Sequence, residues 1–490
     1  MPSFVCNQFS GGMNEVLSPW LLDNKTAVVL ENADVDTGKL KGLPGPGVLS
    51  VTSAESFGHY GNRNRSVVCW YDRYYWSNND GTGYGGSDES LGVPYPLRHP
   101  VLTKSTSSSG LSGRYKYCWC YVNANGWEGA PCAETGSLWE EIELSGESVT
   151  ITAPSSFPSG VSYIKLYRTV DMGADFYCIG EIRKPNGEFV DTLKDTTLLM
   201  LEPASSFDNY PPPEGGKYLC ESGGVFFLAV GSRLYFSLQG NPHAWPTLNF
   251  IGFDDTIRGI TAEFQGVLVF TSNHTYRITG ADDPETVIKT LIPGDQGCVN
   301  YRTIARVSNA PIWLSNDGIC LWDGESMTVI SHQVMDTHRL QVRYAVSAND
   351  CYYLFLLNGT IVFDHKNGDV FRRLTFTCDY AWYDGDSDRI YMERGGKFYE
   401  YGAGVIRDFT YISPYIGDSG LAYKQFTELV VSHKGELCIT GILDGREYFV
   451  LEHVSGYRNR IKLPYPSTGM SFQVKITGPG ELSEIAVLYE

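Results

Sequence analysis

The sequence lacks any hydrophobic stretch long enough to cross a membrane. Its longest apolar runs, residues 225–230 and 352–357, are far shorter than the roughly 18 residues that a spanning helix needs. The opening residues MPSFVCNQFSGGMNE contain neither a basic segment nor the apolar core of a secretion signal. We therefore expect a protein without a membrane span that first folds in the cytosol.

Basic residues are also scarce. The chain has 38 Lys and Arg against 56 Asp and Glu, a formal net charge of −18, and the acidic excess is greatest in residues 111–213 and 214–404. Proteins that grip nucleic acid hold the phosphates through clustered basic residues. This balance argues against a tight DNA-binding protein.

Motifs for transition metals and for catalysis are missing as well. The twelve cysteines include no CxxC pair, and the nine histidines form no HExxH motif, so we expect free buried thiols and no cofactor. Three aspartates at alternate positions, Asp384, Asp386 and Asp388, resemble the first turn of a calcium loop. Arg389 stands where that loop needs glycine, so a solvated turn is the favoured interpretation and the metal site the weaker one.

Other short motifs give no coherent active site. Residues 417–420 (GDSG) resemble a serine-protease segment, but no histidine base accompanies them. Residues 315–318 (SNDG) are close to the Asp-box of sialidase-like propellers, which is a folding motif. The acidic pairs 254–255 and 282–283 cannot be shown to form the two-carboxylate site of a glycosidase. The aromatic run at residues 70–76 is more typical of a blade core than of a stacking surface. We therefore expect no enzyme.

What the sequence has in abundance is turn and strand formers. It contains 53 Gly, 24 Pro and 32 Tyr, a mixture that favours short strands and excludes an all-helical fold. Between residues 217 and 404, short β-runs recur with hairpin turns near Gly231, Gln265, Ala310, Asp350 and Asp386. This spacing approaches the length of a propeller blade. With a sixth hairpin at residues 66–76, the pattern predicts an all-β propeller of six blades, with seven as the alternative.

Four regions follow from the same patterns. We expect N-terminal strands and the first blade in residues 1–110, an inserted fibronectin- or immunoglobulin-like sandwich in 111–213, the main blades in 214–404, and a C-terminal β-domain in 405–490. Residues 81–113 are so rich in Gly, Ser and Pro that we expect no regular structure there.

Motifs spread along most of the chain then resemble a known family. They include Phe9-Ser10-Gly11-Gly12, Asn32-Ala33-Asp34, Gly38-Lys39-Leu40, Tyr167-Arg168-Thr169, Phe189-Val190-Asp191-Thr192, the segments 229–237 and 275–280, Gly240-Asn241-Pro242, Trp245-Pro246, Phe253-Asp254-Asp255, Gly297-Cys298-Val299, Trp313-Leu314-Ser315 and Asp317-Gly318. In their order along the chain they are similar to the tail nozzle, or tail hub, proteins of short-tailed bacteriophages. The similarity is weakest after residue 404.

This resemblance implies a structural virion protein at the distal end of the tail. Such a subunit would form a ring, a hexamer by expectation, around a channel through which double-stranded DNA passes without being specifically bound. Its partners would be further copies of itself, a tail adaptor, and fibre, spike or needle proteins. It would be assembled in the host cytoplasm and located in the virion tail. The glycine-rich residues 78–96, with Asn78, Tyr84 and Tyr95, are our candidate for a channel or gating loop.

Two other classes of protein remain open from the sequence. One is a carbohydrate-binding or carbohydrate-cleaving propeller that recognises a receptor, in which Asp254 or Asp384 would take part. The other is a scaffold propeller that binds other proteins through its faces. Ring formation would distinguish the nozzle from both.

Overall fold

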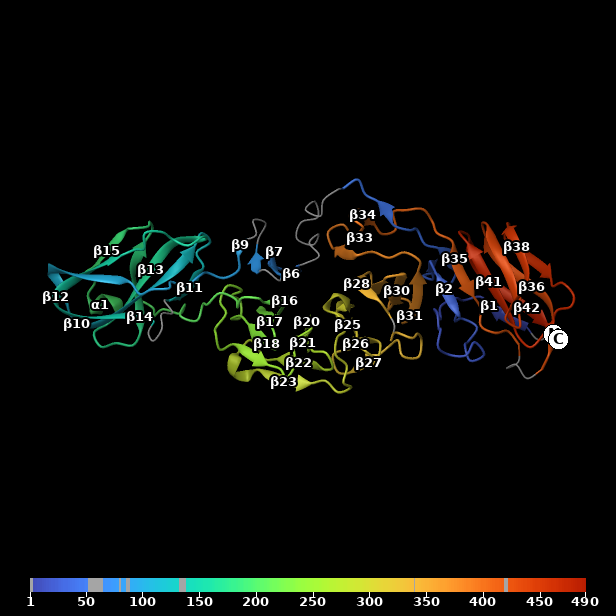
Figure 1. Cartoon of the computed structure of the whole chain (residues 1–490), viewed down its shortest axis with the longest axis horizontal. Helices are drawn as coiled ribbons and strands as arrows, with labels where there is room; N and C mark the ends of the chain where they lie inside the picture. Colours follow the sequence, from blue (N-terminus) through green and yellow to red (C-terminus); the bar gives the residue numbers. More distant parts are fainter. Residues whose placement is uncertain are drawn as a thin grey trace. The chain divides into compact units, whose positions relative to one another are not determined.

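The computed structural model describes residues 3–51, 65–78, 81–84, 89–131, 138–338, 340–417 and 422–490, with only the backbone of 107–109. The chain divides into two compact units: residues 1–63, 270–275 and 291–490 form the first unit, and residues 64–269 and 276–290 form the second. Nearly all regular structure is β (Figure 1). No helix among the described residues is long and apolar enough to cross a membrane.

The second unit contains three four-stranded antiparallel sheets, each a simple meander. The sheets are β6 (Ser66–Trp70), β7 (Arg73–Ser77), β8 (Thr82–Tyr84) and β9 (Glu89–Ser90); β16 (Lys217–Ser222), β17 (Val225–Val230), β18 (Arg233–Phe236) and β19 (Phe250–Gly252); and β20 (Gly259–Glu263), β21 (Gly266–Phe270), β22 (Thr275–Thr279) and β23 (Ile288–Leu291). Strand β16 contacts both β6 and β20, so adjacent sheets pack on each other.

The first unit contains three further sets of four strands. They are β24 (Ala305–Val307), β25 (Ala310–Leu314), β26 (Ile319–Trp322) and β27 (Met327–Val329); β28 (Val342–Ala348), β29 (Cys351–Leu356), β30 (Gly359–Asp364) and β31 (Val370–Leu374); and β32 (Tyr380–Asp384), β33 (Arg389–Arg394), β34 (Lys397–Glu400) and β5 (Gly47–Val48). Strand β28 contacts β24 and β32. Five of the six four-stranded sets are separate sheets, and the set β28–β31 is part of a larger sheet. The described residues thus form six blade-like sets. The prediction of a propeller is confirmed.

Turn chemistry explains the blade hairpins. The loops Ser308-Asn309, Asn349-Asp350 and Gly395-Gly396 each place two consecutive residues at positive φ, the geometry of the two-residue turn that matches strand twist. Short polar residues and glycine tolerate this conformation best. Burial of the strands differs between blades: β29 and β30 are buried along their whole length, whereas β34 buries only Phe398.

The insert folds around its own core in the second unit. Its strands are β10 (Val101–Asn123), β11 (Glu128–Pro131), β12 (Glu140–Thr152), β13 (Val161–Thr169), β14 (Phe176–Ile182) and β15 (Glu188–Asp191), followed by the one-turn helix α1 (Asp195–Leu198). They form a single sheet, because β10 pairs with β12 on both sides of a register shift. The predicted boundary between residues 110 and 111 falls within β10.

The C-terminal strands combine with strands from the N-terminus. Those strands are β1 (Ser3–Cys6), β2 (Val29–Glu31), β3 (Ala33–Asp34), β4 (Leu40–Gly42), β35 (Phe409–Ile412), β36 (Lys424–Lys434), β37 (Leu437–Leu443), β38 (Arg446–Val454), β39 (Arg458–Lys462), β40 (Thr468–Gly469), β41 (Phe472–Gly478) and β42 (Glu481–Tyr489). Strands β1 and β4 pair with β42, and β2 joins β31 to β35. The N-terminal strands thus belong with the C-terminal sheets, whereas we expected them beside the first blade.

Candidate functional site

The three aspartates of the weak metal candidate lie in the hairpin between β32 and β33. Asp384 accepts hydrogen bonds from the Asp386 amide (3.2 Å) and the Ser387 hydroxyl (2.6 Å), and Asp388 accepts one from Tyr383 (2.7 Å). The described residues contain no group of three or more His, Cys, Asp or Glu that could hold a metal ion. The Asp384 and Asp388 carboxylates thus accept hydrogen bonds within their own hairpin, whereas Asp386 contributes its backbone amide.

Of the residues chosen for a gating loop, Asn78 and Tyr84 belong to the first blade and Tyr95 follows it, whereas residues 79–80 and 85–88 of this segment lie outside the described residues. Tyr84 ends strand β8, is 4% exposed, and accepts a hydrogen bond from Asn125 (2.9 Å), while burial raises its pKa to about 12. Asn78 closes a turn with Gly81, and the Tyr95 ring contacts Tyr210. The expectation that residues 81–113 hold no regular structure is wrong, because β8, β9 and the first half of β10 lie there.

A close contact explains why glycine occurs inside such a strand. A Cβ atom on Gly83 would lie 2.3 Å from the ring of Trp76 on the neighbouring strand β7. The glycine thus makes room for the indole rather than marking a free loop. Tyr75 and Trp76 are buried, as expected for a blade core, whereas Tyr71 at the hairpin turn is 82% exposed.

The remaining candidate motifs serve local structure. Ser315 is buried, and its hydroxyl accepts the amides of Asp317 and Gly318 (both 3.2 Å), which fixes the turn of the Asp-box-like segment. Asp283 caps the short 3-10 helix Pro284–Thr286. The segment 417–420 lies outside the described residues after Gly417.

The cysteines show thiol behaviour typical of core residues. The eleven described cysteines are free, and eight of them are buried. Burial raises the pKa of Cys6 to about 11 and that of Cys320 to about 12, so these thiols stay protonated at neutral pH.

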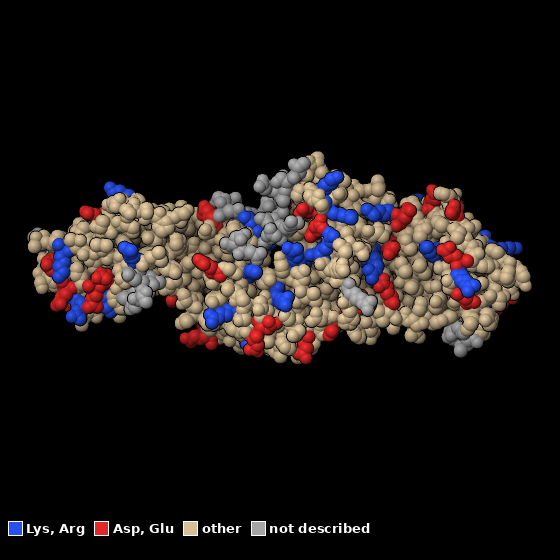
Figure 2. Space-filling model, in the orientation of Figure 1, with Lys and Arg blue, Asp and Glu red and all other residues tan. Residues whose placement is uncertain are grey.

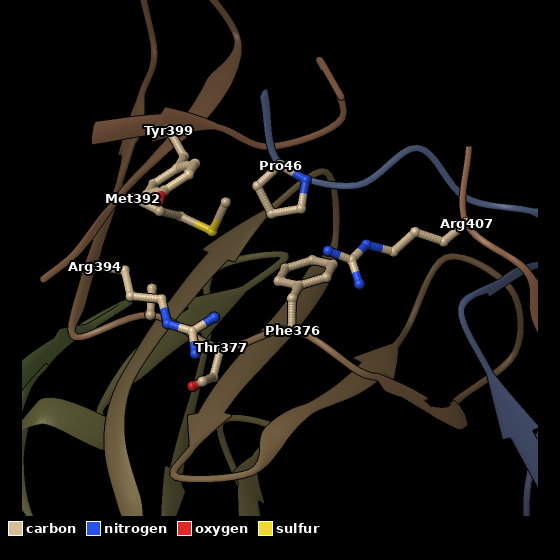
Figure 3. Close-up of a pocket in the computed structure, with 8 residues that line it drawn as sticks. Pro46, Phe376, Thr377, Met392, Arg394, Tyr399 and Arg407 are labelled. Carbon is tan, nitrogen blue, oxygen red and sulfur yellow. The ribbon is translucent and has the colours of Figure 1, made fainter. Parts of the chain in front are cut away.

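An arginine-lined pocket lies in the first unit, where the β28–β31 blade meets the β32–β34 blade. Its volume is about 100 Å³. We call it the arginine pocket and define it by its lining residues: Pro46, Phe376, Thr377, Cys378, Met392, Arg394, Tyr399 and Arg407. Figure 3 shows the Arg394 guanidinium directed toward Thr377 and the Arg407 guanidinium beside the Phe376 ring. The arrangement is an apolar floor with two cations at its edge.

A chain of polar contacts positions Arg407. Its guanidinium lies 5.6 Å from the Phe376 ring centre and donates to the Thr375 hydroxyl (3.3 Å). Thr375 is held in turn by Asn32, whose side chain accepts the Thr375 amide (2.9 Å). Gly45 leaves space for the guanidinium, since a Cβ there would lie 2.5 Å from Arg407 Nε. The arginine is thus fixed from three separate chain segments.

Sequence reasoning missed this pocket. Arg394 and Arg407 carry no motif, and Pro46 approaches them from more than 300 residues away in the sequence. The only usable signal was Asn32, which belongs to the Asn32-Ala33-Asp34 motif and adopts φ +51° while buried. Nothing in that motif indicated that it holds an arginine.

Two buried ion pairs elsewhere stabilise structure. In the insert, Arg168 and Asp191 are both fully buried, with Nη1 of the arginine 2.9 Å from the carboxylate. In the first unit, Arg372 lies 3.2 Å from the buried Asp364. A buried charge that has lost its partner is costly, so removal of either member of such a pair destabilises the fold around it.

Comparison with known proteins leaves function open. No family model matches the chain, and no curated protein matches it. Among solved structures, BamB from Moraxella catarrhalis aligns at 10% identity and a TM-score of 0.30, over 73% of this chain and all of that one. The extracellular domain of the one-component system BT4673 from B. thetaiotaomicron gives 11% and 0.31, over 89% and 82% of the two chains. The WD40 domain of Neurospora crassa Pan2 gives 7% and 0.30, over 74% and 94%. At these scores no functional argument follows, and the fold assignment rests on the strand pairing.

Proposed function

We propose that this chain is a structural protein of the tail of a short-tailed bacteriophage, forming the distal tube or nozzle through which the genome leaves. The observation that carries the proposal is the order of the nozzle-like motifs along a propeller chain that also has an inserted β-domain and a second β-domain. The chain would be located in the virion tail after assembly in the host cytoplasm.

Several motif residues occupy positions that the fold requires, which supports reading the motifs as more than chance matches. Gly12 has φ +64°, and a Cβ there would lie 2.6 Å from the Val370 Cβ. Asn32 holds Thr375, and Arg168 with Asp191 forms the buried pair of the insert.

The charge of the chain suits a conduit. With 56 acidic against 38 basic residues, the protein repels phosphate on average, and duplex DNA can pass without being held by counterion release. Figure 2 shows Lys and Arg interspersed with Asp and Glu on the visible face. A ring would further bind a tail adaptor on one side and fibre, spike or needle proteins on the other.

The glycine-rich residues 78–96 remain the proposed channel or gating loop, with Asn78 and Tyr95 as its candidate residues. Tyr84 is packed against Tyr75 and His243. A residue held in this way cannot swing into a channel without unfolding part of the blade, so Tyr84 would anchor this segment rather than move with it.

Electron microscopy of the purified chain, together with light scattering, tests the proposal. A closed ring with a central opening wide enough for duplex DNA is the expected result. A monomer that binds or hydrolyses glycans would instead favour a receptor-recognition propeller. A monomer that captures other proteins through its faces would favour a scaffold.

A further inference from the structure

The arginine pocket has the chemistry of a site for a carboxylate carried on an apolar segment. Phe376 is 5% exposed and Met392 is 1% exposed, and together with Pro46 they form an apolar floor. A volume of about 100 Å³ accommodates one side chain end rather than a cofactor. Two guanidinium groups beside such a floor favour an anionic group, which arginine binds with directed hydrogen bonds.

The two arginines differ from most arginines of the same unit. Arg343, Arg372, Arg373, Arg389, Arg458 and Arg460 each lie within 4 Å of a carboxylate. Among the described residues no carboxylate lies that close to Arg394 or Arg407. The nearby Asp379 is already engaged by Arg343 and by the Gly395 amide. As far as the described residues show, Arg394 and Arg407 have no carboxylate within 4 Å, so both are available to an outside acid.

Exposed apolar residues lie on the chain segments that line the pocket. Val48, Val405 and Ile406 are 72%, 84% and 59% exposed, and we call these three residues the apolar rim. They come from the two chain segments that also supply Pro46 and Arg407. These segments are held together by the Gly45 amide bonded to the Val405 carbonyl (2.9 Å) and by a bridge between Pro44 and Ile406. A free small molecule would leave this rim uncovered, whereas a protein segment would bury it.

We infer that the arginine pocket and the apolar rim bind an acidic residue, flanked by apolar residues, from a second copy of this chain. The inference rests on the proposed ring and names a contact within it. A second copy offers many exposed carboxylates, which gives the charge complementarity.

Each copy contributes one arginine pocket and one acidic segment to this contact. Such a pair of surfaces can meet twice about a two-fold axis, or once at each interface of a closed ring. The proposed ring uses the second arrangement, and the mass measured by light scattering distinguishes it from a two-fold dimer.

Charge reversal tests the inference. In R394E the acid would meet the incoming carboxylate, and we expect the dissociation constant between copies, measured by light scattering and sedimentation, to rise about 30-fold or more. R446E is the matched control, because Arg446 is an exposed cation at the start of strand β38 and does not line the pocket. It should assemble as the wild type does. Far-ultraviolet circular dichroism and the melting temperature would show that both variants fold.

The conservative variant R394K identifies the partner residue. Zero-length carbodiimide crosslinking joins the amine of the lysine at position 394 to a carboxylate in contact with it. When isotopically light and heavy chains are mixed, mass spectrometry of the crosslinked peptides distinguishes links between two copies from links within one copy. Links between copies from this position support the inference. Their absence in assembled rings, or rings unaffected by R394E, overturns it while leaving the conduit in place. A wild-type chain that stays monomeric at every attainable concentration also overturns the docking of a second copy. The proposed conduit is tested separately, by locating the chain in intact phage particles.

Discussion

The buried ion pair of the insert gives the most quantitative prediction. Arg168 makes three bonds there: to Asp191 (2.9 Å), to the Leu193 carbonyl (3.0 Å) and to Asp195 (2.9 Å). Tyr117 donates to the same Asp191 oxygen (2.8 Å). Replacing Arg168 by leucine leaves the fully buried Asp191 carboxylate without its cation. Removing one partner of such a pair costs about 3 to 5 kcal/mol.

Hydrogen exchange of the full chain, followed by mass spectrometry, measures this loss locally. An opening free energy lowered by about 3 to 5 kcal/mol accelerates exchange about 10²- to 10⁴-fold in peptides from β13 and β15. Arg183→Leu is the matched control, since Arg183 is exposed and makes an ion pair with Glu181 and a contact with the Tyr163 ring at the surface. Exchange there should change by less than about fivefold. Combining R168M with D191L should restore part of the protection, because neither charge then remains buried. Wild-type exchange in R168L would refute the reasoning.

Three further predictions concern other parts of the chain. Burial lowers the pKa of His243 to about 4, whereas the pKa of a histidine in the unfolded chain is near 6.5, so the unfolded state binds more protons between these two pH values. The second unit should therefore lose about 3 kcal/mol of stability as the pH falls from 6.5 to 4. Calorimetry should show a smaller loss in His243→Gln. Gly12→Ala should destabilise the first unit by about 1 to 3 kcal/mol in urea unfolding, because of its φ of +64° and its contact with Val370, and an unchanged midpoint would contradict this. Adding calcium should leave the melting temperature of the wild-type chain unchanged, and the Asp384→Asn variant should melt at the same temperature with and without calcium. If calcium raised the melting temperature of the wild type and this substitution abolished the rise, the metal site would be restored.

Local patterns predicted the blades because their causes are local. The β-runs at residues 225–230 and 233–238 correspond to β17 and β18. The turn expected near Asp350 is present because Asn349 and Asp350 both tolerate positive φ. Here the sequence period and the turn residues together determine where a strand begins and ends.

Long-range pairing could not be read in the same way. Strands β1 and β4 pair with β42, more than 400 residues away, and no local signal announces such a partner. The glycine of β8 resembled a loop residue, although Gly83 is there to accommodate Trp76. The arginine pocket combines residues from four separate segments, so only the tertiary structure brings Arg394 and Arg407 together.

Labelling of purified particles tests the central claim most directly. Antibodies against the insert, applied to intact phage particles that encode this chain and viewed by electron microscopy, should mark the distal end of the tail, and mass spectrometry of the same particles should detect the chain. Particles that lack the chain, or that carry the label elsewhere than on the tail, would contradict the account.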